Sequence, residues 1–200
     1  ESRLESIVER NDAAFLQPCE LRPSAYLTDA APLLRALQRP HASHKGSFGD
    51  VVVLGGQGLA VNGQSMTGAA WLAALAALHG GAGRTMLALL DWATHRQSDD
   101  ADAALMPGDG SSAIAPWPEI MLRRPEAQSW DGATVVCGCG GGQAIAPWLP
   151  LVLAQAPRLV LDADALNAIA ADAQLAQLLQ GRAGLGWSTV LTPHPLEAAR

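Results

Sequence analysis

The feature that most restricts the possible folds is a short apolar run at residues 51–54, which is followed by Gly55 and Gly56. A continuous apolar run between glycines is typical of a strand that is buried on both faces of a parallel sheet. Residues 66–79 are rich in alanine and leucine and almost free of charge, which predicts a helix packed closely on that sheet. A strand, a glycine-rich loop and a helix in this order present backbone N–H groups to a polar or anionic ligand.

The same alternation continues along the chain. Further strands are predicted at residues 84–90, 134–137, 158–162 and 188–191, and helices at residues 24–38, 117–124, 144–155, 164–171 and 172–180. Residues 92–109 are predicted to form a loop. The pattern predicts an α/β fold, a three-layer α/β/α sandwich with a mainly parallel central sheet. Four predicted strand ends finish in glycine or polar residues, which favours a ligand site at the carboxyl edge of the sheet.

Composition excludes several classes of partner. The chain has 200 residues, of which 49% are hydrophobic and 16% are charged, so it can bury one sizeable core. Its net charge of −6 and its lack of a basic run argue against a nucleic-acid partner. No apolar stretch reaches the roughly 18 residues of a membrane span, so no membrane partner is expected. We expect a cytoplasmic protein with reduced cysteines, because Cys137 and Cys139 lie too close in sequence for an unstrained disulfide.

Six segments, taken together and in this order, resemble the NAD(P)H-hydrate dehydratase family. They are residues 44–56, 66–70, 80–83, 138–142, 161–167 and 191–197. The resemblance implies a ribokinase-like domain over residues 24–200, with residues 1–23 as a linker or the tail of a preceding epimerase-like domain. It also implies a homo-oligomer, with a tetramer as one form.

The activity implied by the resemblance is a lyase reaction that repairs nucleotides. Family members convert hydrated NADH or NADPH back to NADH or NADPH, with ADP or ATP and Mg²⁺. Phosphorylation of the hydroxyl group turns a poor leaving group into a good one, and positioning and charge neutralisation supply most of the catalysis.

The resemblance also assigns candidate site residues. By position in the matching motifs, Ala70, Gly138, Gly140 and His194 are expected at the hydrated nucleotide, and Lys45, Asp162 and Asn167 in the nucleotide, phosphate or metal region. Cys139 stands where the family has proline. The family's catalytic Asp belongs to a Gly-Thr-Gly-Asp motif that is expected beyond Arg200. No catalytic residue is therefore assigned, and residues 1–200 alone are expected to be inactive.

The residues themselves leave other interpretations open. Lys45, the only lysine, can be a surface residue, His194 can stabilise its own loop, and Asp162 and Asp164 can cap a helix. The glycines at 138–142 exceed what a turn needs, which favours a ligand close to the backbone. A small-molecule kinase of the same fold, for a thiazole, pyrimidine or sugar-type substrate, and a non-catalytic nucleotide-binding fragment are the alternative functions. Residues 44–46 together with residues 192–195 favour the dehydratase.

Overall fold

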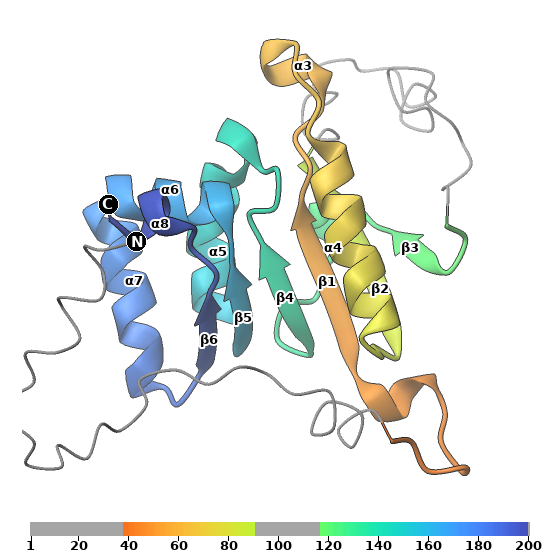
Figure 1. Ribbon diagram of the computed structural model, residues 1–200. Coiled ribbons are helices and arrows are strands. Elements are labelled where there is room, and N and C mark those ends of the chain that lie inside the picture. The colour runs from red at the N-terminus through yellow and green to blue at the C-terminus, as the bar shows by residue number, and fades with distance from the viewer. Residues whose placement is uncertain (1–37, 91–116, 200) are drawn as a thin grey trace, which may run out of the picture. The chain divides into compact units, whose positions relative to one another are not determined.

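The computed structural model describes residues 38–90 and 117–199 (Figure 1). Residues Arg39–Arg200 form one compact unit. The expected boundary after residue 23 and the expected loop at residues 92–109 lie outside the described residues, as does the expected helix at residues 24–38 except for Gln38. Within the described part of the chain, no helix is long and apolar enough to cross a membrane.

The centre of the described unit is a six-stranded parallel sheet with the order β3-β2-β1-β4-β5-β6. The strands are β1 (Asp50–Gly55), β2 (Arg84–Leu89), β3 (Ile120–Leu122), β4 (Ala133–Cys137), β5 (Arg158–Leu161) and β6 (Ser188–Leu191). The five strands predicted from the sequence are thereby confirmed, and so is the parallel sheet.

β3 corrects one prediction, because the sequence predicted a helix at residues 117–124. Its three residues extend the sheet beyond β2, and Ile120 is buried in the core. A run of three apolar residues is too short for its periodicity to separate a strand from a helix.

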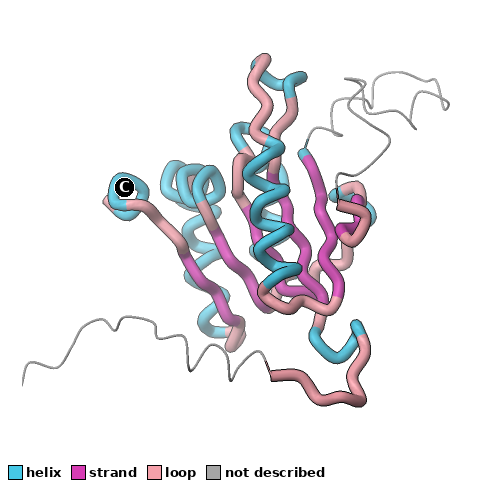
Figure 2. Tube along the Cα trace, turned by 45° about the vertical axis from the view of Figure 1, so that its right-hand side comes forward, coloured by secondary structure: helices cyan, strands magenta, loops and turns pink. Residues whose placement is uncertain are grey.

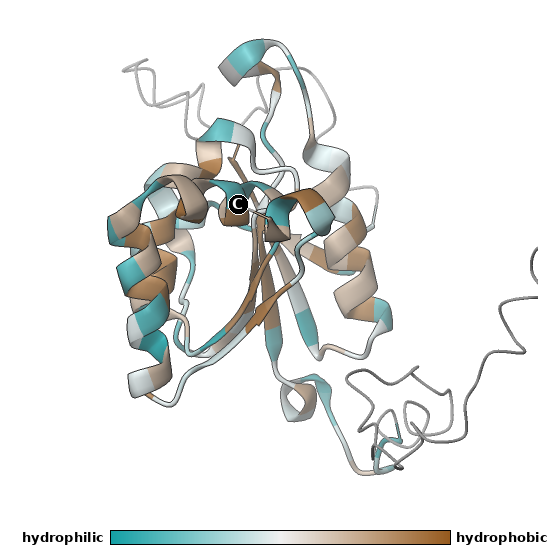
Figure 3. Ribbon diagram, turned by 60° about the vertical axis from the view of Figure 1, so that its left-hand side comes forward, coloured by the Kyte–Doolittle hydropathy of each residue, from teal (hydrophilic) through white to brown (hydrophobic). Residues whose placement is uncertain are grey.

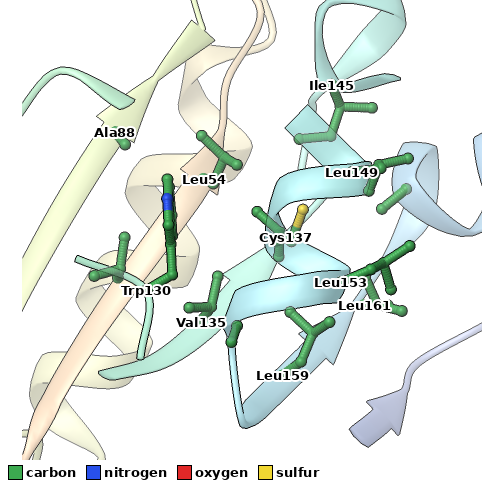
Figure 4. Close-up of a cluster of buried hydrophobic side chains, with 14 of the residues drawn as sticks. Leu54, Ala88, Trp130, Val135, Cys137, Ile145, Leu149, Leu153, Leu159 and Leu161 are labelled. Atoms are coloured by element: carbon green, nitrogen blue, oxygen red, sulfur yellow. The ribbon is translucent and has the colours of Figure 1, made fainter. Parts of the chain in front are cut away.

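Helices cover both faces of the sheet, and each face has its own core (Figure 2). The side chains of β1 alternate between the two cores, with Val53 on the side of α4 (Thr67–His79) and Val52 and Leu54 on the other side. The larger core packs α5 (Leu149–Gln155), α6 (Ala163–Ala171) and α7 (Ala173–Gly184) against the sheet. Figure 4 shows part of it, with Trp130, Val135 and Leu159 among its members. The three-layer sandwich is therefore confirmed.

The remaining elements are short. They are the 3₁₀ turns η1 (Lys45–Phe48), η4 (Pro125–Ala127) and η5 (Gly142–Trp148), and the helices α3 (Leu59–Asn62) and α8 (Pro195–Ala198). The helix expected at residues 144–155 divides into η5 and α5. Pro147 lies inside η5 and Pro150 at the start of α5, and neither can donate a backbone hydrogen bond to the preceding turn.

β6 lies at one edge of the described sheet, and a buried arginine fixes its position. Arg182 of α7 is only 2% exposed, and it donates hydrogen bonds to Thr189 Oγ1 (2.8 Å) and to the carbonyl oxygen of Leu153 (2.8 Å). Burial lowers the pKa of this guanidinium group. Figure 3 shows the apolar strands of the sheet beside helices, some of which carry more polar residues on their outer faces.

The strand order places a crevice beyond the ends of β1 and β4. From β1 the chain moves outward to β2 and β3, and then returns to β4 on the other side of β1 before it continues to β5 and β6. In parallel sheets, ligands bind at this kind of topological switch point, beyond the carboxyl ends of the strands.

Candidate functional site

The loops that follow β1 and β4 are hydrogen-bonded to each other beyond the ends of the strands. Gly56 N–H donates to the carbonyl oxygen of Cys139 (3.0 Å), and Gln57 N–H donates to that of Gly140 (2.7 Å). A Cβ atom at Gly55 would lie 2.3 Å from the Cys139 carbonyl oxygen, so this approach requires glycine. The two loops therefore form one rigid base for the crevice.

We call residues 138–142, which follow β4, the glycine loop. Gly138 has φ +114°, and a Cβ atom there would lie 2.1 Å from the carbonyl oxygen of Asp162. Gly140 has φ +58°, and its Cβ atom would lie 2.4 Å from the carbonyl oxygen of Met66. The sequence suggested that a ligand approaches this backbone, whereas the structure shows that neighbouring segments of the same chain already do.

Asp162 lies between two loops and does not cap α6 with its side chain. Its Oδ1 atom accepts a hydrogen bond from Thr192 Oγ1 (2.7 Å), and its Oδ2 atom accepts one from Cys139 Sγ (3.3 Å). Asp162 is the N-cap residue of α6, but its side chain makes no capping hydrogen bond. Burial, followed by the contact with Asp162, raises the pKa of Cys139 to about 12.

Asp164 is turned toward the glycine loop. Its Oδ2 atom accepts a hydrogen bond from Gly142 N–H (2.8 Å), so the helix-capping interpretation is also not what the structure shows for this residue. Between the two carboxylates, Ala163 has φ +43°, a conformation that costs a non-glycine residue about 1 kcal/mol. The turn at Ala163 directs Asp162 and Asp164 to different loops.

A pocket of about 440 Å³, lined by apolar as well as polar atoms, opens between α3, the glycine loop with η5, and α6. Its polar side chains are those of Asn62, Gln143, Asp164 and Asn167. Asp164 and Asn167 lie three residues apart and so project from the same face of α6. Carboxamides and one carboxylate suit the hydroxyl and amide groups of a nucleoside better than they suit an apolar ligand.

The described residues suit only one mode of Mg²⁺ binding, in which the protein supplies one or two carboxylates. They contain no group of three or more His, Cys, Asp or Glu side chains that could hold a metal ion. At nucleotide sites Mg²⁺ is bound through one or two carboxylates, with phosphate oxygens and water. Asp164, which lines the pocket and has one hydrogen-bonded oxygen atom, is the described carboxylate that suits this mode.

Of the seven expected site residues, only Asn167 is among the residues that line the pocket; the others are Lys45, Ala70, Gly138, Gly140, Asp162 and His194. Lys45 belongs to η1, before β1, and a Cβ atom at Gly83 would lie 1.7 Å from its carbonyl oxygen. It is therefore at the amino edge of the sheet, and β1 with its six residues spans roughly 20 Å to the carboxyl edge. Ala70 is 0% exposed in the core beneath α4, so its side chain offers no surface to a ligand.

His194 lies in the loop after β6 and begins α8. Its Nδ1 atom accepts a hydrogen bond from Leu196 N–H (3.1 Å), and its Nε2 atom lies 3.2 Å from Glu197 Oε1. Its side chain is nevertheless 58% exposed. The structure thus gives His194 a local capping role and leaves part of its ring accessible.

The sequence analysis missed Gln57. This residue is 0% exposed, and its side chain contacts both Asn62 and Ala144. The available signal was one polar residue directly after Gly55 and Gly56, at the end of an apolar strand.

Comparison with known proteins adds to this geometry. A family model described as NAD(P)H-hydrate dehydratase matches residues 51–200. The ADP-dependent (S)-NAD(P)H-hydrate dehydratase of Neisseria meningitidis serogroup B is 36% identical over an alignment of 184 residues, and the match covers 84% of this chain and 53% of that protein. The bifunctional NAD(P)H-hydrate repair enzyme Nnr of Gloeobacter violaceus is 38% identical over an alignment of 178 residues, and the match covers 87% of this chain and 31% of that protein.

Among solved structures, a ribokinase-like superfamily protein from Enterococcus faecalis V583 aligns with a TM-score of 0.53 and 22% identity. The alignment covers 88% of this chain and 58% of that one, and it shows a common fold. The chain thus spans about half the length of the first curated relative and about a third of the second.

Proposed function

Because the chain belongs to the NAD(P)H-hydrate dehydratase family, we propose that it forms the substrate-binding part of an enzyme that restores NADH or NADPH from the hydrated forms. The observation that carries the proposal is the pocket beside the glycine loop, because it contains four polar side chains and lies at the switch point of the sheet within the matched residues 51–200. The cosubstrate in this proposal is ADP or ATP with Mg²⁺, and the protein acts in the cytoplasm.

The proposed reaction removes water in two steps. The hydroxyl group of the hydrated ring first accepts a phosphoryl group from the nucleotide. The C–O bond then breaks with the electron pair leaving on phosphate, while the neighbouring carbon loses a proton and the ring double bond forms. Charge neutralisation and alignment supply most of the rate in phosphoryl transfer.

In this scheme the described residues bind and orient. The carboxamides of Asn62, Gln143 and Asn167 hold the hydroxyl and amide groups of the substrate, and Asp164 is the carboxylate available to Mg²⁺. The base that takes the proton stays assigned to the segment expected beyond Arg200. The homo-oligomer and the fused epimerase-like domain also stay predictions.

The test is the recovery of absorbance at 340 nm when hydrated NADPH is mixed with Mg²⁺ and either ADP or ATP. It is run on the natural full-length protein and, in parallel, on residues 1–200. We expect recovery with the full-length protein only. Absence of recovery with either nucleotide contradicts the dehydratase, and phosphorylation of a small alcohol substrate in its place supports the kinase alternative.

Substitution of His194 tests whether the loop after β6 contributes to substrate binding. His194→Ala is expected to raise the KM for hydrated NADPH about tenfold if the exposed ring contacts substrate. Gln177→Ala, an exposed change on α7, serves as the control. If His194→Ala leaves both KM and kcat at the values of the control, His194 has only its capping role.

A further inference from the structure

Gln57 is a buried polar side chain that the proposed reaction does not use. It is fully buried, and all four of its hydrogen-bonding groups have a partner. Its backbone N–H donates to Gly140 O (2.7 Å), and its carbonyl oxygen accepts from Met66 N–H (2.8 Å). In the side chain, Nε2 donates to Asn62 Oδ1 (3.2 Å) and Oε1 accepts from Ala144 N–H (3.2 Å). A buried amide whose nitrogen and oxygen are both hydrogen-bonded to other segments fixes its neighbours strongly.

The two side-chain contacts reach two different elements that line the pocket. Asn62 is on the wall formed by α3, and Ala144 is in η5 between the pocket residues Gln143 and Ala146. The carboxamide of Gln57 is planar and rigid, so it sets the distance between these walls.

Gly142 shows that the glycine loop is shaped around this carboxamide. A Cβ atom at Gly142, which has φ +53°, would lie 2.3 Å from Gln57 Oε1. The N–H of Gly142 in turn donates to Asp164. Gln57, Gly142 and Asp164 therefore form a continuous series of contacts from the end of β1 to α6.

We propose that Gln57 is a positioning residue of this site, which holds Asn62 and η5 at the separation that the substrate requires. It does not touch the ligand, because it is completely buried. The choice of ligand, a nicotinamide dinucleotide, rests on the proposed function. The positioning role itself rests on the two side-chain hydrogen bonds and on Gly142.

Gln57→Glu separates positioning from packing. A protonated Glu can donate to Asn62 and accept from Ala144 as Gln does, whereas an ionised Glu can only accept. Burial raises the pKa of a carboxyl group, so the pH at which the introduced side chain changes from the protonated to the ionised form moves toward neutral. Asp164, across Gly142, is the charged side chain nearest to this position among the described residues that line the pocket, and it is present in every variant.

The experiment measures the affinity of the full-length protein for NADP⁺ by calorimetry at pH 6 and pH 8. We expect Gln57→Glu to bind about tenfold more weakly than the wild type at pH 8, and to approach the wild type at pH 6. Gln57→Met, which keeps the length but loses both hydrogen bonds, should bind about tenfold more weakly at both values. Gln64→Glu and Gln64→Met are the controls, because only the backbone N–H of Gln64 contacts Asn62.

Two further measurements separate the possible failures. The KM for hydrated NADPH should rise in Gln57→Met with little change in kcat, because the variant alters binding and leaves the reacting groups in place. If the wild type neither binds NADP⁺ nor restores NADPH, the proposed function fails, and hydrogen exchange at the Ala144 amide then decides the positioning role. Faster exchange there in Gln57→Met than in Gln64→Met supports the role.

The positioning proposal is overturned if Gln57→Met and Gln57→Glu match the Gln64 controls in affinity, KM and Ala144 exchange. It is also overturned if the Gln57→Glu defect is the same at both pH values, because a loss of packing alone does not depend on protonation. If Gln57→Glu does not fold at pH 8, the comparison between Gln57→Met and Gln64→Met decides.

Discussion

Two loops that contact the same carboxylate are held in different ways. The glycine loop after β4 is hydrogen-bonded to two other segments, residues 54–57 and residues 162–164, and Gly138 and Gly141 within it are buried. The edge loop, which we define as residues 192–195 after β6, is exposed at every residue. Asp162 lies between them and accepts a hydrogen bond from each.

The difference follows from the position of each strand in the sheet. β4 has neighbours on both sides, so its loop must fit against β1 and α6 and has room only for backbone at Gly138, Gly140 and Gly142. β6 has one neighbour among the described strands, and its exposed loop is held by its own residues and by the hydrogen bonds of Thr192 to Leu161 and Asp162. Pro193 and Pro195 restrict the backbone there, and His194 caps α8. The glycine loop is therefore fixed by packing, whereas the edge loop is fixed by its own sequence and by Thr192, which leaves His194 accessible to a ligand.

The comparison of the two loops predicts that one added methyl group disrupts the glycine loop. Gly138→Ala should lower the free energy of unfolding by about 3 kcal/mol or more, because its Cβ atom would meet backbone and its φ is positive. Gly181→Ala in α7 is the control, since nothing lies within 4 Å of its Cβ position, and it should stabilise the protein by about 0.5–1 kcal/mol. Chemical denaturation measures both, and a Gly138→Ala variant as stable as the wild type would show that the loop is not fixed by packing.

The sequence predicted the elements in which many residues repeat one pattern. β1, β2, β4, β5 and β6 are apolar runs flanked by turn residues, so they were found, whereas β3 was too short to be recognised. The split between η5 and α5 was missed because Pro147 and Pro150 were given less weight than the apolar pattern around them.

The candidate site was predictable in place but not in detail. Strand ends rich in glycine and polar residues pointed to the carboxyl edge of the sheet, and the pocket that Asn167 lines is found there. The role of Gln57 depends on contacts with Asn62 and with Ala144, which is 87 positions away, and no local pattern records such a pair. Lys45 was grouped with the site by motif order, and motif order does not show at which end of a strand a residue lies.

The Cys139 thiol, which donates to Asp162 from the glycine loop, makes the free energy of unfolding depend on pH in the alkaline range. The pKa of Cys139 is raised from 9.0 to about 12, so between these values the unfolded chain loses the proton while the folded chain keeps it, and stability falls as pH rises. Cys139→Ala should remove this part of the slope, about 0.7 kcal/mol per pH unit after allowance for partial exposure of the thiol. Denaturation of both proteins between pH 9 and pH 11 measures it, and parallel slopes would show that the thiol ionises as freely as in the unfolded chain.

The Thr192 hydroxyl, which donates to Asp162 from the edge loop, should contribute least to the free energy of unfolding. Thr192→Val keeps the shape of the side chain and removes the donor to Asp162 Oδ1, which lies 2.7 Å away. Because this contact is exposed, the expected loss in the free energy of unfolding is about 0.5–1 kcal/mol. Thr192→Val combined with Cys139→Ala then shows whether Asp162 connects the two loops. A coupling energy of about 0.5 kcal/mol means that the carboxylate is held by both donors together, whereas additivity within about 0.3 kcal/mol means that each loop is positioned independently.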